Sequence, residues 1–188
     1  MKGYIYSMYK GADPGVGFTL TDPIFTGTPS LGACMPNIRR LVEKGDFIFA
    51  ISGKVKNVQQ YVVGGFEVDR KIDALTALSE VPENALRKEG DGSYRGNIII
   101  DKEGNRHPDD YHTNYEKRLD NYIIGKNGLY IDSSNQIEMA REQTLPTLNE
   151  LKGKEALSVF ECIGRWSKLD SHEVRKLIKW MEELKKAS

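Results

Sequence analysis

Short apolar runs alternate with turn-forming stretches in the first half of the chain, a pattern typical of β-strands. Residues 3–8 alternate and carry aromatic and β-branched side chains, and the runs at 46–52 and 60–69 are rich in Val, Ile and Phe. The short turn between these last two runs predicts an antiparallel hairpin. Gly64 and Gly65 inside the second run predict a bulge or a close backbone approach.

Weaker signals surround this hairpin. Pro36 suits the first turn of a helix, which we expect to end at Gly45. A second short helix is predicted at 72–79, and further short strands are predicted at 97–100, 121–125 and 129–131. The intervening stretch at 10–32 is rich in Gly, Asp, Pro and Thr. It is long for a connection inside a compact domain, and such loops often carry function.

The last third of the chain has a helical pattern. Asp170 and Glu173 have the spacing of a capping box, and the helix that they open carries an apolar stripe made of Val174, Leu177, Ile178, Met181 and Leu184. We therefore predict one α+β domain over residues 1–188. Residues 1–132 would form a mainly β core with short helices, and residues 133–188 a helical C-terminal part.

Composition limits the classes of function. The 188 residues include 27 Lys and Arg against 27 Asp and Glu. A net charge of zero does not favour tight nonspecific binding to a nucleic-acid duplex, although the total leaves open that basic residues gather in one groove. A chain of this length buries enough surface to fold without a cofactor or metal. With no signal sequence and no membrane-length apolar run, we expect a cytoplasmic protein that does not contact a membrane.

The two cysteines, Cys34 and Cys162, have no partner at a short metal-ligand spacing, so no zinc site is predicted. We expect two reduced, buried thiols, although the sequence leaves a disulfide between them open. The chain also lacks a G-x-S-x-G elbow, an H-E-x-x-H helix and a P-loop. The glycine-rich stretch at 11–17 favours a turn over phosphate binding, because its Pro and Asp break the dinucleotide fingerprint.

Three clusters could carry chemistry or bind a ligand. The segment at 107–112 holds two imidazoles and two carboxylates, which could transfer protons or bind a metal; alternatively it is a turn with surface histidines. Asn37 near a predicted helix start, with Arg39 and Arg40 beyond it, could hold a phosphate or be an idle surface pair. Trp166 beside a cation could stack on a base or be ordinary core.

Two resemblances add to this interpretation. The runs at 43–52 and 60–68 resemble the central strands of PUA-like domains of the ASCH and EVE branches. This resemblance implies a curved β-sheet or barrel with peripheral helices and a cleft that accepts a base. The stretches KGYIYSMYKGADPG, TDPIF, LGACMPNIRR and IGRWSKLD resemble the nucleotide-modification-associated domain of type two. That family is named from gene context with DNA-base modification, so the resemblance implies a link to modified nucleotides but no reaction.

From these resemblances we predict a module that recognises a nucleotide or a modified base in nucleic acid. Its ligand-binding residues would serve for stacking, edge contacts, phosphate contacts and loop closure: Thr21, Asp22, Asn37, Arg39, Arg40, Ser52, Tyr61, Arg165, Trp166 and Ser167. Two alternatives remain. The protein could be an enzyme acting on a nucleotide or base through Asp22 or the segment at 107–112, or a protein-interaction adaptor in a modification or defence system.

Overall fold

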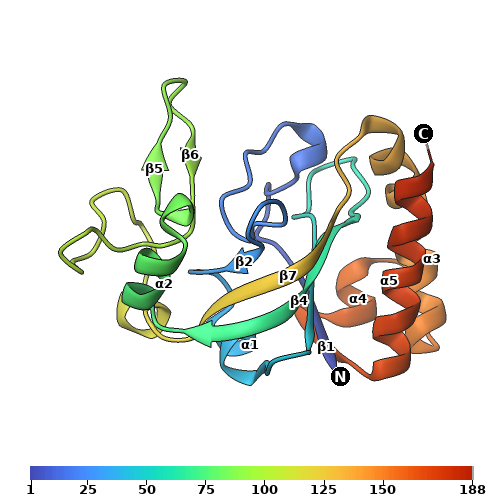
Figure 1. Cartoon of the computed structure of the whole chain (residues 1–188). Helices are drawn as coiled ribbons and strands as arrows, with labels where there is room; N and C mark the ends of the chain where they lie inside the picture. The colour runs from blue at the N-terminus through green and yellow to red at the C-terminus, as the bar shows by residue number, and fades with distance from the viewer. Residues whose placement is uncertain (188) are drawn as a thin grey trace. The chain divides into compact units, whose positions relative to one another are not determined.

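The structure, a computed structural model, describes residues 1–187 and confirms the α+β class (Figure 1). Six strands form one mixed sheet in the order β2-β7-β4-β3-β1-β8. Because this order begins at β2 and ends at β8, the sheet is open and not closed into a barrel. The strands are β1 Gly3–Ser7, β2 Ser30–Leu31, β3 Phe47–Ile51, β4 Val62–Ile72, β7 Tyr122–Tyr130 and β8 Trp166–Leu169, while β5 Arg87–Lys88 and β6 Tyr94–Arg95 form a separate hairpin.

Five α-helices and three short 3-10 helices complete the described chain. The α-helices are α1 Pro36–Leu41, α2 Ala74–Glu80, α3 Ser134–Lys152, α4 Val159–Ile163 and α5 Ser171–Lys186. The 3-10 helices are η1 Pro14–Val16, η2 Pro82–Asn84 and η3 Tyr115–Arg118. Within residues 1–187, none of these helices combines the length and the apolar character that crossing a bilayer requires.

The chain packs as two compact units that alternate along the sequence. The first unit contains residues 1–18, 46–66 and those from 129 onward, and the second contains Thr19–Gly45 and Glu67–Gly128. Strands β4 and β7 each have residues in both units. The single domain with a mainly β part up to residue 132 and a helical part beyond it stays a prediction.

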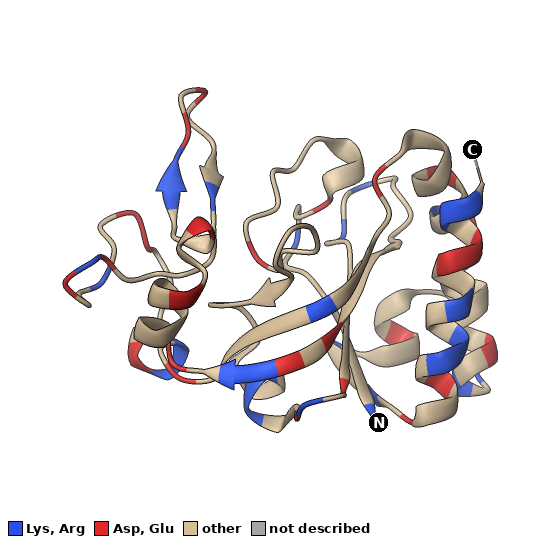
Figure 2. Ribbon diagram, viewed as in Figure 1, with Lys and Arg blue, Asp and Glu red and all other residues tan. Residues whose placement is uncertain are grey.

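In the first unit, β1 lies between a parallel neighbour, β3, and an antiparallel neighbour, β8. Helix α5 begins with the predicted capping box, in which the Asp170 carboxylate accepts from the Glu173 N–H and the Glu173 carboxylate accepts from the Asp170 N–H. Its predicted stripe is confirmed, since Val174, Leu177, Met181 and Leu184 are buried. A Cβ on Gly3 would lie 2.6 Å from Val174. The helix can therefore pack closely on β1. The outer face of α5 carries both signs of charge (Figure 2).

The predicted hairpin of β3 and β4 is confirmed as antiparallel. Gly45, before β3, donates its N–H to the carbonyl of Val68 at 2.8 Å, and Ser52, after β3, donates to the carbonyl of Tyr61 at 2.8 Å. The two pairs run in opposite directions along the strands. A Cβ at Gly65 would lie 2.4 Å from the Phe49 ring, so this glycine permits a close approach, as the sequence predicted.

Three local predictions in the second unit are wrong. Helix α1 ends at Leu41 because Val42 is already extended, and Gly45 instead forms the turn before β3 with a φ of 85°. Residues 97–100 are not a regular strand, since only isolated bridges occur there. The two strands predicted at 121–125 and 129–131 are the single strand β7. Gly128 in this strand is a packing glycine, because a Cβ would lie 2.4 Å from the Phe25 carbonyl oxygen.

Candidate functional site

The second unit presents a cysteine on a tightly held loop. Three successive N–H groups, of Gly32, Ala33 and Cys34, donate to the carboxylate of Asp22 at 3.0, 2.8 and 2.5 Å. These residues connect β2 to α1, so the carboxylate sets the path of the chain that carries the thiol. Cys34 itself is partly exposed, whereas Asp22 is buried.

A buried polar network holds Asp22 from its other side. The side-chain amide of Asn97 donates to Asp22 at 2.9 Å and to the Ser30 hydroxyl at 2.9 Å. The Tyr122 hydroxyl donates to the Asn97 carbonyl at 2.7 Å, and the amide of Asn84 donates to both Ser30 and Tyr122. Sequence reasoning missed this network because its members come from separate segments that share no local motif.

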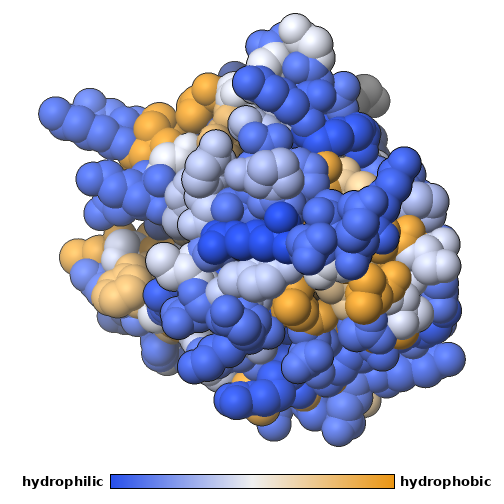
Figure 3. All heavy atoms as spheres, turned by 90° about the vertical axis from the view of Figure 1, so that its left-hand side faces the viewer, coloured by the Kyte–Doolittle hydropathy of each residue, from blue (hydrophilic) through white to orange (hydrophobic). Residues whose placement is uncertain are grey.

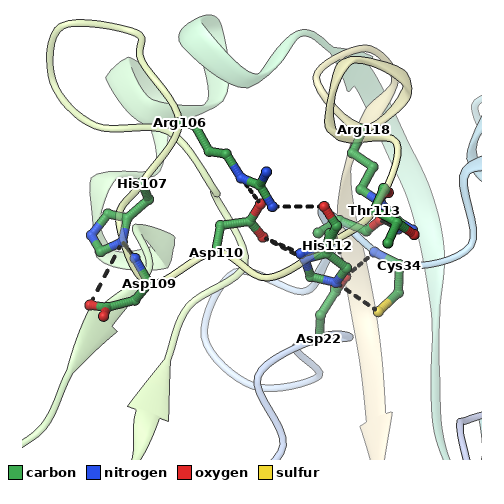
Figure 4. A network of polar contacts seen from close by, with 10 residues as sticks. Asp22, Cys34, Arg106, His107, Asp109, Asp110, His112, Thr113 and Arg118 are labelled. Atoms are coloured by element: carbon green, nitrogen blue, oxygen red, sulfur yellow. Dashed lines mark hydrogen bonds and ion pairs between the residues drawn. The ribbon is translucent and has the colours of Figure 1, made fainter.

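His112 faces the thiol from the segment at 107–112 (Figure 4). Its Nε2 lies 4.0 Å from the Cys34 sulfur, and its Nδ1 lies 2.6 Å from the carboxylate of Asp110. The Asp110 side chain is 0% exposed while that of His112 is 34% exposed. Because an ionised carboxylate only accepts hydrogen bonds, the ring proton belongs on Nδ1, and Nε2 is free to accept a proton from the thiol.

The other residues of this segment have different roles. Arg106 donates from Nε to Asp110 at 2.9 Å and from Nη2 to the His112 carbonyl at 2.7 Å, which orients both groups. His107 accepts the N–H of Asp109 at 3.2 Å, so it shapes the turn. The two histidines therefore differ in their surroundings: His112 lies beside the Cys34 thiol and Asp110, and His107 takes part in a turn.

Arg118 connects the two loops that bear the thiol and the imidazole. Its Nη1 donates to the carbonyl of Ala33, the residue before Cys34, at 2.5 Å. Its Nε donates to the carbonyl of Thr113, the residue after His112, at 2.9 Å. A planar guanidinium held at both edges has a defined orientation. Arg118 thus fixes the spacing between the Cys34 loop and the His112 loop.

Arg39 lies beneath the thiol loop and is 0% exposed. Its Nε donates to the carbonyl of Cys34 at 3.0 Å, and its Nη1 donates to the carbonyls of Arg118, Asp120 and Asn121 at 3.3, 2.8 and 3.2 Å. Its Nη2 has no hydrogen-bond partner among the described residues. The guanidinium of Arg39 therefore has a structural role toward the backbone and retains one buried donor.

The charges around the thiol act in opposite directions. Burial, followed by the charge and hydrogen bond of Asp22, raises the pKa of the Cys34 thiol above its ordinary value, while Arg118 and Arg39 act to lower it. Burial also lowers the pKa of Arg39 to about 10, which leaves the guanidinium charged at neutral pH. The thiol is consequently protonated at rest. Nucleophilic attack by Cys34 would require a base, which His112 can supply.

The predicted ligand-binding residues are divided between the two units. In the second unit, Asn37 and Arg40 are exposed on α1 and Thr21 is partly exposed. Asp22 and Arg39 are buried and already bonded to the backbone as described. The sequence predicted that Arg39 and Arg40 together hold a phosphate. In the structure Arg39 is buried and Arg40 is exposed, so the two side chains are in different surroundings.

In the first unit, Ser52 and Tyr61 are buried and Ser52 accepts the N–H of Tyr61 through its hydroxyl at 3.1 Å. A guanidinium, that of Arg141, covers the Tyr61 ring with its carbon 4.7 Å from the ring centroid. Arg165 is exposed, and Trp166 and Ser167 on β8 are partly exposed. The binding role assigned to these residues stays a prediction.

No group of three or more His, Cys, Asp or Glu side chains in residues 1–187 is arranged to hold a metal ion. Comparisons with protein-family models, curated proteins and solved structures found no match to the chain. The protein is thus an α+β protein with an open mixed sheet. In its site the Cys34 thiol contacts the His112 imidazole, which in turn contacts the Asp110 carboxylate. This arrangement is the geometry of an activated nucleophile, its base and the group that orients the base.

Proposed function

We propose that this protein is an enzyme that uses the Cys34 thiol as a nucleophile, with His112 as general base and Asp110 orienting the imidazole. One observation carries the proposal: Nε2 of His112 lies 4.0 Å from the Cys34 sulfur while Nδ1 lies 2.6 Å from Asp110. The same order of groups recurs in nucleophilic catalysis on unrelated folds.

The proposed reaction begins with attack of the sulfur on an electrophilic carbon of the substrate. His112 takes the thiol proton and then gives it to the leaving group, so that a thioester links the substrate acyl carbon to Cys34. Water deprotonated by His112 would then release the product and restore the thiol. Asp110 stabilises the imidazolium that forms in each step.

The resemblance to the nucleotide-modification-associated domain of type two supports a nucleotide, or a nucleic acid with a modified base, as the substrate. The resemblance of the β3–β4 hairpin to PUA-like domains supports a base as the group recognised, because domains of that kind accept a base in a cleft. We propose the cytoplasm as the place of action.

Alkylation of Cys34 by iodoacetamide tests the base directly. Replacing His112 by Gln is expected to slow alkylation at pH 7 by about 100-fold, because the variant retains no base beside a thiol whose pKa is raised. Mass spectrometry of digested samples over a time course would give the rate at Cys34 separately from that at Cys162.

His107→Gln is the matched control for this measurement, because it removes an imidazole from the same segment at a position bonded to Asp109. It should leave the rate at Cys34 unchanged. The pH dependence of the alkylation rate is a second expectation. Because the pKa of Cys34 is raised, the rate in the His112→Gln variant should keep rising with pH beyond the range in which an ordinary thiol ionises. Equal alkylation rates at Cys34 in the wild type and in His112→Gln from about pH 6 to about pH 9, a range that includes the ordinary pKa values of histidine and cysteine, would contradict the proposal.

Recognition without chemistry is a second candidate, and the partial exposure of Trp166 beside the exposed Arg165 favours it. β8, which carries Trp166, is an edge strand of the sheet. Replacing Trp166 by Ala should weaken the binding of nucleoside monophosphates about ten- to a hundredfold, since stacking contributes roughly 1–3 kcal/mol per base. Titration calorimetry would measure this, after a melting curve has established that the variant folds.

Cys34→Ser separates the two candidates. It should leave nucleotide binding unchanged if the protein is only a recognition module, and it should abolish turnover if the protein is the proposed enzyme. The adaptor alternative would gain support if no nucleotide binds and the protein instead forms a stable protein complex. The face drawn in Figure 3 is mostly hydrophilic, with small separate hydrophobic areas, and so offers little contiguous apolar surface for such a complex.

A further inference from the structure

Two guanidiniums near the Cys34 thiol have hydrogen-bond donors that the protein does not use. A guanidinium carries N–H groups on each of its nitrogens. In Arg118 the Nε and Nη1 groups contact carbonyls, and its Nη2 donates to no described residue. In Arg39 the Nη2 is buried without a partner among residues 1–187. Arg39 is 0% exposed, so its free donor is closed to a ligand, whereas Arg118 is partly exposed and its Nη2 can donate to an acceptor from outside the protein.

Charges of both signs surround the thiol. Asp22 acts to raise the pKa of Cys34, and Arg118 and Arg39 act to lower it. The carboxylate of Asp22 is already bonded to three backbone N–H groups and Asn97. The carboxylate of Asp110 is bonded to Arg106 and His112. Among residues 1–187 Arg118 donates only to backbone carbonyls and contacts neither carboxylate, so its charge is not neutralised by direct contact with an acid.

We propose that Arg118 forms an anion subsite beside Cys34, so that the substrate carries an oxyanion close to its reacting carbon. This inference rests on the proposed function and specifies its substrate class: a carboxylate or a phosphate group adjacent to the electrophilic carbon. Arg118 is well placed for this role, because it is partly exposed and is held between the thiol loop and the imidazole loop. A preorganised guanidinium loses little freedom when it binds an oxyanion.

Two small electrophiles of the same size but different charge test the subsite. In both iodoacetate and iodoacetamide the Cys34 sulfur bonds to the methylene carbon, the carbon–iodine bond breaks, iodide leaves, and His112 accepts the thiol proton. The reagents differ only in a carboxylate against a neutral amide. The quantity measured is the ratio of the two alkylation rates at Cys34, with the same chain unfolded in urea as the reference.

In the folded protein this ratio should favour iodoacetate by about tenfold relative to the unfolded chain, which corresponds to one modest charge-assisted hydrogen bond. Inorganic phosphate should slow the reaction with iodoacetate by competing for the same donors. Arg118→Gln should return the ratio to the unfolded value, whatever its effect on the absolute rates, because the ratio compares two reagents on the same variant. Arg118→Lys should retain part of the preference, because it keeps the charge without the planar fork.

Lys117→Gln is the matched control, because it removes a neighbouring exposed cation on η3 and should leave the ratio unchanged. The subsite is overturned if the folded wild type shows the same ratio as the unfolded chain, or if Lys117→Gln abolishes the preference as fully as Arg118→Gln. If Arg118→Gln does not fold, the wild-type ratio and the phosphate competition still decide. Alkylation that depends on His112 but shows no preference would overturn only the subsite, whereas rates independent of His112 would overturn the proposed enzyme.

Discussion

Replacing Asp22 by Ala is expected to lower the free energy of unfolding by about 4 kcal/mol, one of the two largest effects of any single substitution that we anticipate. The carboxylate accepts hydrogen bonds from three backbone N–H groups, those of Gly32, Ala33 and Cys34, and from the amide of Asn97. Alanine would leave these four donors without an acceptor in a buried region. Urea denaturation followed by circular dichroism would measure the change.

Asp73→Ala is the matched control for this substitution. The Asp73 carboxylate also accepts a backbone N–H, that of Thr76, but it is exposed at the start of α2, so water can replace it and the expected cost is about 1 kcal/mol. Equal destabilisation by the two variants would show that Asp22 does not organise the thiol loop. Asp22→Asn should lie between them, because an amide keeps one acceptor oxygen but loses the charge.

Replacing Arg39 by Met should destabilise the protein by about 3 kcal/mol, the second large effect. Methionine has a similar length and fills the buried space, but it cannot donate to the carbonyls of Cys34, Arg118, Asp120 and Asn121. Loss of the Arg39 charge would also raise the pKa of the Cys34 thiol further, because that charge acts to lower it. Urea denaturation would give the free energy, and iodoacetamide alkylation would report the thiol.

The neighbouring arginine provides a close comparison. Arg40 is exposed on the same helix, so Arg40→Met should change the free energy of unfolding by less than about 0.5 kcal/mol. If both variants were equally stable, the buried guanidinium would not hold the loops together. If Arg40→Met alone weakened phosphate binding, the sequence prediction of a phosphate contact on this helix would apply to Arg40.

The sequence predicted elements whose signals are local. The apolar, β-branched runs at 46–52 and 60–69 identified β3 and β4 and their antiparallel pairing, because apolar content and a short turn are properties of neighbouring residues. Helix α5 was predicted with its cap and its buried stripe for the same reason: a helix face repeats every three or four residues. The strand expected at 97–100 failed since an apolar run of four residues can be buried without a regular partner.

The site could be predicted only in parts. The sequence singled out the segment at 107–112 and the residues from Cys34 to Arg40 as separate clusters, and it predicted Cys34 as a reduced, buried thiol. The pairing of Cys34 with His112 joins residues 78 positions apart. No local pattern specifies such a contact, because it depends on where β2 and the segment after β6 come together in the fold.

Arg39 and Arg40 show most clearly why the burial of a polar side chain could not be predicted from the sequence. The sequence by itself determined that two arginines follow a helix start. Whether a guanidinium is buried depends on acceptors from elsewhere in the chain, here the carbonyls at 118–121. Local patterns therefore determined the elements of this protein, whereas only the tertiary structure decided which polar groups meet, because hydrogen bonds and charge act across space and not along the sequence.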